Sequence, residues 1–135
     1  MNKHKLNILL VDDSYAVNFY NKNYLENSGI CNEILESRHG QEAIELLNKM
    51  ILEKSAFPDI IFLDLNMPVM DGWRFLERYE EISDEIRNKT AIYILTTSVN
   101  PAEKERAEKN DVVDKYYTKP INKEILDFII KEHQV

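Results

Sequence analysis

Five polar side chains of this sequence each follow a short run of apolar or aromatic residues. They are Asp12, Asp13, Asp64, Thr96 and Lys119. An unbroken apolar run such as Ile60–Leu63 favours a central parallel strand that is covered on both faces. The carboxyl ends of parallel strands meet at one edge of a sheet, where open α/β sheets bind their ligands. We therefore expect these side chains to converge at one edge.

The three carboxylates in this set need a partner of opposite charge. Carboxylates a few ångströms apart repel one another, so either a proton or a cation must neutralise them. Oxygen ligands with several retained waters suit Mg²⁺. The ammonium of Lys119 and the hydroxyl of Thr96 can bind phosphate oxygens. Such a cage permits a carboxylate to act as nucleophile and form an aspartyl phosphate, and Asp64 is the best candidate because Asp12 and Asp13 are better placed to hold the metal.

The hydrophobic pattern predicts strands that alternate with helices five times. The expected strands are about 7–11, 33–37, 60–63, 91–95 and 115–118. The expected helices run from 13 or 14 to 28, 41–53, from 72 to an end left open between 80 and 89, 100–110 and 122–132. In the first helix, Val17, Tyr20, Tyr24 and Leu25 keep roughly helical spacing. This alternation predicts an α/β fold: a single flavodoxin-like, doubly wound domain with a five-stranded parallel sheet in the order 2-1-3-4-5 and five helices.

Length and composition fit one domain that spans residues 1–135. The chain has 135 residues, of which 44% are hydrophobic, enough for a core of its own. The net charge of -7 argues against a nucleic-acid partner, which would require a basic surface. A single cysteine, Cys31, excludes an intramolecular disulfide. No stretch approaches the roughly 20 apolar residues of a membrane span, so we expect a cytoplasmic protein with no membrane partner.

The combination of these residues resembles the receiver domain of bacterial two-component response regulators, in particular the stand-alone, chemotaxis-receiver-like form. The motifs that carry the resemblance are Asp12-Asp13, Leu63-Asp64-Leu65-Asn66-Met67-Pro68, Asp71-Gly72, Thr96 and Lys119-Pro120. Taken with the strands and helices around them, they extend the resemblance over essentially all 135 residues. It implies a single-domain phosphorelay protein that accepts a phosphoryl group on Asp64 from a histidine kinase or a histidine phosphotransfer protein. A downstream protein target and a homodimer are further partners that the resemblance allows.

The resemblance also implies a role for each site residue. Asp13 and Asp64 ligate Mg²⁺, helped by the backbone carbonyl of Asn66 and, through water, by Asp12. Lys119 contacts the phosphoryl group and precedes a cis proline. The switch pair is implied to be Thr96 and Tyr116. The implied output face comprises the helix expected at 100–110, the strand at 115–118 and the helix at 122–132.

Two positions beside Thr96 bear on the lifetime of the phosphoryl group. Thr97 stands where the family usually has Ala or Gly. We expect its extra bulk to narrow the access of water or of a donor to the phosphoryl group. Asn66 and Ser98 occupy the positions that usually tune dephosphorylation, and Ser98 is neither an acid nor an amide. Ser98 is therefore poorly suited to position an attacking water, which predicts a lifetime that is not especially short.

Two other functions compete with this interpretation. A phosphatase of the haloacid-dehalogenase type also uses an aspartyl nucleophile at a strand end, but it needs a second acid two residues later, where this chain has Asn66. Turnover of a small phosphate ester would favour that enzyme. A scaffold that has lost phosphorylation is the other alternative, and it would take up no phosphoryl group from any donor. As a receiver, the protein would be no enzyme beyond self-phosphorylation and slow autodephosphorylation.

Overall fold

The computed structural model describes residues 4–98 and 100–135. Within them the chain forms one five-stranded parallel sheet with the strand order β2-β1-β3-β4-β5. The strands are β1 (Leu6–Val11), β2 (Cys31–Ser37), β3 (Ile60–Leu63), β4 (Ala91–Thr96) and β5 (Lys115–Thr118). The predicted doubly wound α/β fold and its strand order are confirmed.

The described part of the chain also contains six helices, of which the last follows β5. They are α1 (Tyr15–Ser28), α2 (Gly40–Glu53), α3 (Gly72–Tyr79), α4 (Asp84–Arg87), α5 (Pro101–Glu108) and α6 (Lys123–His133). The five predicted helices correspond to α1, α2, α3, α5 and α6. The additional helix α4 is a single turn in the charged stretch before β4, and its four residues are too few to show helical periodicity. None of the described helices is long and apolar enough to cross a membrane.

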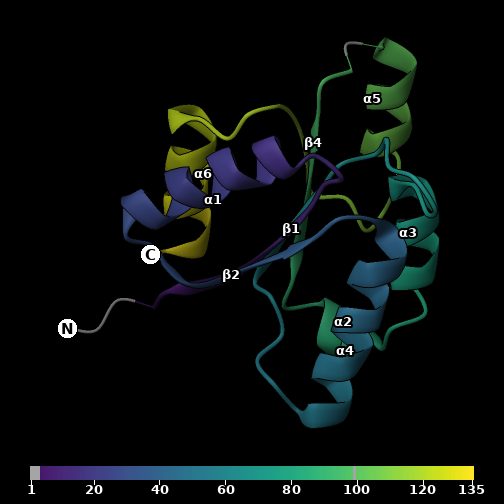
Figure 1. Ribbon diagram of the computed structural model, residues 1–135, viewed down its shortest axis with the longest axis horizontal. Helices are drawn as coiled ribbons and strands as arrows, with labels where there is room; N and C mark the ends of the chain where they lie inside the picture. Colours follow the sequence, from purple (N-terminus) through teal and green to yellow (C-terminus); the bar gives the residue numbers. More distant parts are fainter. Residues whose placement is uncertain (1–3, 99) are drawn as a thin grey trace.

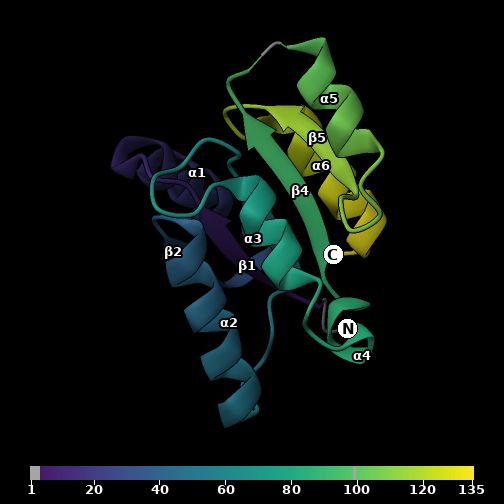
Figure 2. The same cartoon turned by 90° about the vertical axis from the view of Figure 1, so that its right-hand side faces the viewer.

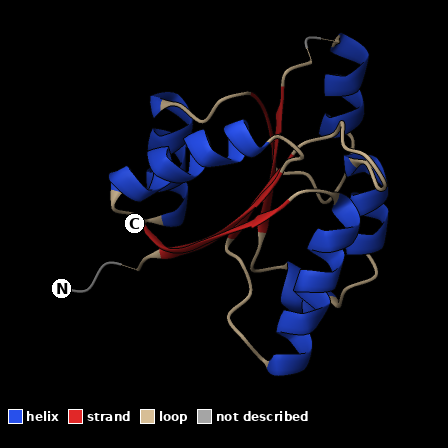
Figure 3. Cartoon of the chain, in the orientation of Figure 1, coloured by secondary structure: helices blue, strands red, loops and turns tan. Residues whose placement is uncertain are grey.

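The helices cover both faces of the sheet, with α1 and α6 on one face and α2, α3 and α5 on the other (Figures 1 and 3). Alternate residues of β1 pack in opposite directions. Leu9 and Val11 join a core cluster with α2 and α3, whereas Ile8 and Leu10 join a second cluster with α1 and α6. Burial on both faces explains why the inner strands are unbroken apolar runs.

Both ends of α1 have residues that commonly cap a helix. Ser14 Oγ accepts from the backbone N–H of Val17 at the start of α1, as expected of an N-cap. Gly29 ends α1 at a φ of 77°, a conformation that glycine adopts at little cost. These boundaries fix α1 so that its first turn lies at the carboxyl edge of the sheet, next to the end of β1.

The strands β2 and β5 form the two edges of the sheet. β2 begins at Cys31, earlier than the predicted Glu33, and pairs with β1 across a register shift between Leu6 and Asn7. β5 occupies the opposite edge, where α5 lies beside it and beside β4 (Figure 2). The carboxyl end of β5 therefore carries the residues that follow it to the same sheet edge as those of β1, β3 and β4.

Candidate functional site

The three predicted acids converge at the carboxyl edge of the sheet. Val11 pairs with Leu63 in neighbouring parallel strands, so the residues that follow them, Asp12 and Asp64, lie side by side. One carboxylate oxygen from each of Asp12, Asp13 and Asp64 lies within 4.8 Å of the others. Asp12 and Asp64 are only 5% and 4% exposed, whereas Asp13 is exposed. The cluster is thus buried on one side and open to solvent on the other.

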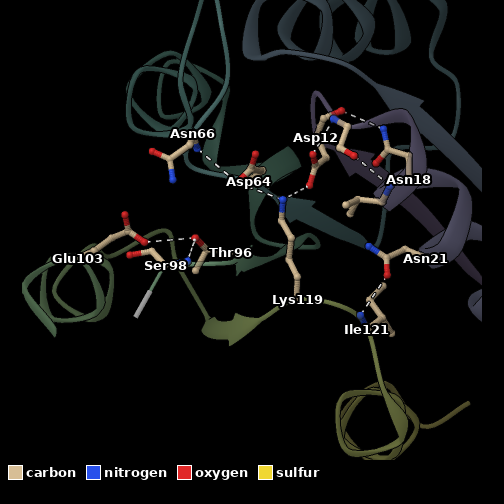
Figure 4. A network of polar contacts seen from close by, with 12 residues as sticks. Asp12, Asn18, Asn21, Asp64, Asn66, Thr96, Ser98, Glu103, Lys119 and Ile121 are labelled. Carbon is tan, nitrogen blue, oxygen red and sulfur yellow. Dashed lines mark hydrogen bonds and ion pairs between the residues drawn. The ribbon is translucent and has the colours of Figure 1, made fainter. Parts of the chain in front are cut away.

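Lys119 brings a positive charge into this cluster from the loop after β5. Its ammonium nitrogen lies 2.5 Å from Asp12 Oδ2 and 3.5 Å from Asp64 Oδ1, and the side chain is 10% exposed (Figure 4). The backbone N–H of Lys119 donates to the carbonyl of Thr96 at 2.8 Å, and the peptide bond to Pro120 is cis. The ammonium is therefore fixed between two carboxylates of different strands.

The environment of Asp64 opposes its own ionisation. Burial raises the pKa of Asp64 to about 6, and the neighbouring charge of Asp12 adds to the rise, while Lys119 and the N–H of Asn66 act in the opposite direction. One ammonium faces three carboxylates, so the cluster has an excess of negative charge. This all-oxygen donor set, with Asp13 open to solvent, fits a hydrated Mg²⁺ ion.

Asn66 approaches the cluster with its backbone. Its N–H lies 3.4 Å from Asp64 Oδ1, and its side chain is exposed to solvent. The main chain of the loop after β3 therefore borders the acids, while the amide group of Asn66 remains at the surface (Figure 4). This placement leaves the backbone of the loop, rather than the side chain, as the group next to Asp64.

Thr96 ends β4 and is fully buried. Its Oγ1 accepts from the N–H of Ser98 at 3.1 Å and donates to Glu103 Oε1 at 3.4 Å. The hydroxyl is thus turned towards α5, and in Figure 4 it contacts Ser98 and Glu103 rather than the acid cluster. Thr97, the bulky residue noted in the sequence, is exposed.

Glu103 connects Thr96 with Tyr116, a contact that sequence reasoning missed. Tyr116 Oη donates to Glu103 Oε1 at 2.9 Å, so both hydroxyl groups share one carboxylate oxygen. Burial, followed by the contact with Glu103, raises the pKa of Tyr116 to about 12. The sequence Asn100-Pro101-Ala102-Glu103, with an acid three residues after the cap, has the spacing of a capping box. Only the Asn100 cap is observed, because the carboxylate of Glu103 binds these side chains.

Two further residues near the site were also missed. Helical spacing singled out Tyr20 on α1, but that ring is 51% exposed, whereas Asn18 and Asn21 are each 2% exposed. Asn18 and Asn21 bond to the two loops that carry Asp12 and Lys119 (Figure 4). Two asparagines three residues apart share one helix face, and that spacing is the signal that could have identified them.

Comparison with known proteins agrees with this arrangement. The family model "Response regulator receiver domain" matches residues 8–131. Response regulator Rcp1 of Synechocystis is 35% identical over 94 residues, which cover 69% of this chain and 63% of that protein. Several other curated relatives are much longer, and the matched stretch covers only 14% to 19% of their length.

Two solved structures share the fold over nearly the whole chain. A two-component response regulator from Cytophaga hutchinsonii is 30% identical with a TM-score of 0.88, and the match covers 96% of this chain and 97% of that one. The chemotaxis protein CheY4 of Vibrio cholerae is 27% identical with a TM-score of 0.74, covering 95% and 98%. The family match over residues 8–131 agrees with the sheet order and with the acid cluster at the carboxyl edge of the sheet. This chain therefore belongs to the response regulator receiver domain family.

Proposed function

We propose that the protein is a phosphorelay response regulator that accepts a phosphoryl group on Asp64 from a histidine kinase or a histidine phosphotransfer protein. The observation that carries this proposal is the buried Asp64 carboxylate, which lies within 4.8 Å of two other acids and 3.5 Å from the Lys119 ammonium. A nucleophile, a cation site and a fixed positive charge are the parts that phosphoryl transfer requires.

In the proposed transfer, a carboxylate oxygen of Asp64 attacks the phosphorus of a phosphohistidine. The new O–P bond forms as the P–N bond breaks, and its electron pair returns to the imidazole of the donor. Lys119 leaves Asp12 and moves to a phosphoryl oxygen, since its ammonium already lies between the two carboxylates. Asp13, Asp64, the Asn66 carbonyl and, through water, Asp12 would hold Mg²⁺, which supplies positive charge to the phosphoryl oxygens.

The signal is proposed to leave through Thr96 and Glu103. A phosphoryl group on Asp64 adds about -1.5 to -2 charges at neutral pH and offers strong acceptors to the Thr96 hydroxyl. When that hydroxyl turns towards them, its contact with Glu103 is lost and Tyr116 is free to reorient. The expected result is a population shift of α5, β5 and α6, the face that a downstream protein or a second copy of the chain would read.

A phosphatase of the haloacid-dehalogenase type receives less support. The residue two positions after Asp64 is Asn66, whose exposed side chain cannot serve as the general acid. Membership of the receiver family favours signalling in the cytoplasm over turnover of a substrate. The phosphoryl group is proposed to have a lifetime that is not especially short, because the side chain of Ser98 is neither an acid nor an amide and is poorly suited to position an attacking water.

Phosphotransfer from purified, radiolabelled histidine kinases tests the proposal. We expect the wild type to take label from at least one kinase and Asp64→Asn to take none from it. Asp111→Ala, which removes an exposed acid outside the cluster, is the matched control and should be labelled like the wild type. Steady hydrolysis of a small phosphate ester would select the phosphatase instead, and equal labelling of Asp64→Asn would refute Asp64 as the acceptor.

A further inference from the structure

Helix α1 places two polar side chains in the core, directly beneath the acid cluster. Asn18 and Asn21 are each 2% exposed and, with Leu25, make up the buried residues of the helix. Burying an amide group costs free energy unless it is hydrogen-bonded, and a leucine of similar size would fill the same space without that cost. Two buried asparagines on one face therefore call for a reason beyond stability.

Asn18 is bonded to the loop that carries the metal-binding acids. Its Nδ2 donates to the backbone carbonyl of Asp12 at 2.9 Å, and both groups are buried. The Asp12 carboxylate in turn accepts from the N–H of Ser14 at 2.9 Å. The main chain between β1 and α1 is thus fixed from both sides, which sets where Asp12 and Asp13 project.

The second polar atom of the Asn18 amide, Oδ1, is buried near the site. Asn18 Oδ1 has no hydrogen-bond partner within the described residues. Asn18 lines a cavity of about 10 Å³ whose lining also includes Asp12, Asn21 and Asp64. A cavity of this size has room for one water-sized group. The amide is therefore oriented by its bond to the Asp12 carbonyl and lies at a small cavity that Asp12 and Asp64 also line.

Asn21 is bonded to the loop that carries Lys119. Its Oδ1 accepts from the backbone N–H of Ile121 at 3.1 Å, a buried contact between residues 100 positions apart. Proline has no N–H, so Ile121 supplies the first backbone donor after Lys119. On the other side of Pro120, the N–H of Lys119 donates to Thr96. The loop is therefore held between β4 and α1.

We infer that Asn18 and Asn21 are positioning residues of the phosphoryl-transfer site: Asn18 fixes the acid loop that binds Mg²⁺, and Asn21 fixes the loop that presents Lys119. One helix face thereby holds the two halves of the site in register. The inference rests on the proposed function, because it assigns the residues to that same site. The inference assigns a different measurable property to each residue: Asn18 affects the affinity for Mg²⁺, and Asn21 affects the rate of phosphoryl transfer. A merely structural role would not distinguish the two residues in this way.

Leucine at each position tests this assignment, because it keeps the volume and removes the bond. Asn18→Leu is expected to weaken Mg²⁺ binding about tenfold, the lower end of the effect of removing a group that orients metal ligands. Asn21→Leu is expected to leave Mg²⁺ binding within twofold and to slow phosphorylation by acetyl phosphate at saturating Mg²⁺ by about tenfold or more, because the ammonium is misplaced. Exchange of the Ile121 amide hydrogen should speed up in Asn21→Leu alone.

Leu25→Ala is the control, because Leu25 is buried on the same helix and its truncation lowers stability without removing either of the two hydrogen bonds. All variants are compared below their melting temperatures. If a leucine variant does not fold, Asn18→Ser and Asn21→Ser carry the same test, because serine is small and polar but too short to reach the loops. The inference is overturned if both asparagine variants lose stability as Leu25→Ala does while Mg²⁺ affinity and rate stay at wild-type values.

Mg²⁺ binding and phosphorylation of the wild type show whether a negative result refutes the inference or the proposed function. A wild type that binds Mg²⁺ but takes no phosphoryl group from any donor would refute the proposed function, and the Mg²⁺ titration of Asn18→Leu would still decide the role of Asn18. A wild type that is phosphorylated while both variants match it in affinity and rate would refute the inference alone. A wild type that shows neither property would refute both.

Discussion

Asp64 is an aspartate whose surroundings disfavour its charge. It is 4% exposed and faces two other carboxylates, and the ammonium of Lys119 offsets these effects only in part. Its pKa is raised from 3.8 to about 6. Ionised Asp64 therefore stores repulsion that a bound cation or a phosphoryl group relieves, which links the acid cluster to ligand binding.

This raised pKa predicts how the stability of the metal-free protein depends on pH. Between pH 3.8 and about 6, the folded protein holds a proton on Asp64 that the unfolded chain has released. The contribution of Asp64 to the free energy of unfolding is therefore expected to fall as pH rises through this window, by up to about 3 kcal/mol. Asp64→Asn should remove most of this fall and be the more stable protein above pH 6. Urea unfolding of both proteins in a chelator checks this, and parallel pH profiles would contradict it.

Asp13, the exposed member of the cluster, is expected to matter for Mg²⁺ and little for the fold. Mg²⁺ at ten times its dissociation constant should stabilise the wild type by about 1.4 kcal/mol, which raises the melting temperature by a few degrees. Asp13→Ala should lose most of this increment and be at least as stable as the wild type without metal, because one like charge is gone. Melting curves with Mg²⁺ and with a chelator measure both effects. A wild-type curve that ignores millimolar Mg²⁺ would argue against the metal site.

The sequence identified the residues whose side-chain types are unusual at strand ends. Asp12, Asp64 and Lys119 follow strands that the apolar runs make plain, and the structure brings them together. Asn18 and Glu103 were missed for a physical reason. Polar residues on helices are usually solvated, and their contacts with the loop after β1 and with β5 depend on how α1 and α5 pack. Local sequence does not encode that packing.

Helix α5 shows how a sparse set of anchors can leave an element free to shift. Most residues of this helix are charged, and Ala107 is its buried residue. Arg106 lies over the ring of Trp73 at 3.9 Å, and Glu103 bonds to Tyr116. Two of these three attachments are polar contacts, and one of them leads directly to Thr96. Elements with few buried contacts lie at the low end of local stability.

The start of α3, by contrast, leaves no room for movement. A Cβ at Gly72 would lie 2.7 Å from both the carbonyl oxygen of Asp64 and the Cα of Leu65. Gly72→Ala should therefore cost about 1–3 kcal/mol and displace the loop after β3, with loss of Mg²⁺ affinity and phosphorylation. Gly29→Ala is the control. It is strained by a φ of 77° but has no neighbouring atom within 4 Å, so it should lose stability alone. Normal phosphorylation of Gly72→Ala would contradict this tight fit.

The whole molecule follows the predicted topology because its pattern is consistent along the chain. Apolar runs alternate with amphipathic helices, and right-handed crossovers leave few sheet orders. The strand order β2-β1-β3-β4-β5 then brings residues from four strand ends to one edge. The one-turn helix α4 and the early start of β2 escaped prediction. Both lie where the sequence is charged or weakly apolar, and neither affects the carboxyl edge.

This architecture predicts where phosphorylation changes the molecule. Beryllofluoride with Mg²⁺, which mimics a phosphoryl group on a carboxylate, should alter hydrogen exchange mainly in the described residues between Thr96 and Asn122. Helices α1 and α2 should change little, because their buried faces join the core clusters. Thr96→Ala should still bind beryllofluoride and lose most of the change. Altered exchange in α1 and α2, with α5 and β5 unaffected, would show that the signal takes another route.

The identity of the phosphorylated residue is the most direct test of the whole account. The wild type is incubated with acetyl phosphate and Mg²⁺, and the modified residue is located by peptide mass spectrometry, with a chelator sample as control. We predict a single phosphoryl group on Asp64, released by hydroxylamine as expected of an acyl phosphate, and none in Asp64→Asn or without Mg²⁺. A phosphoryl group on another residue, or full modification of Asp64→Asn, would contradict the account.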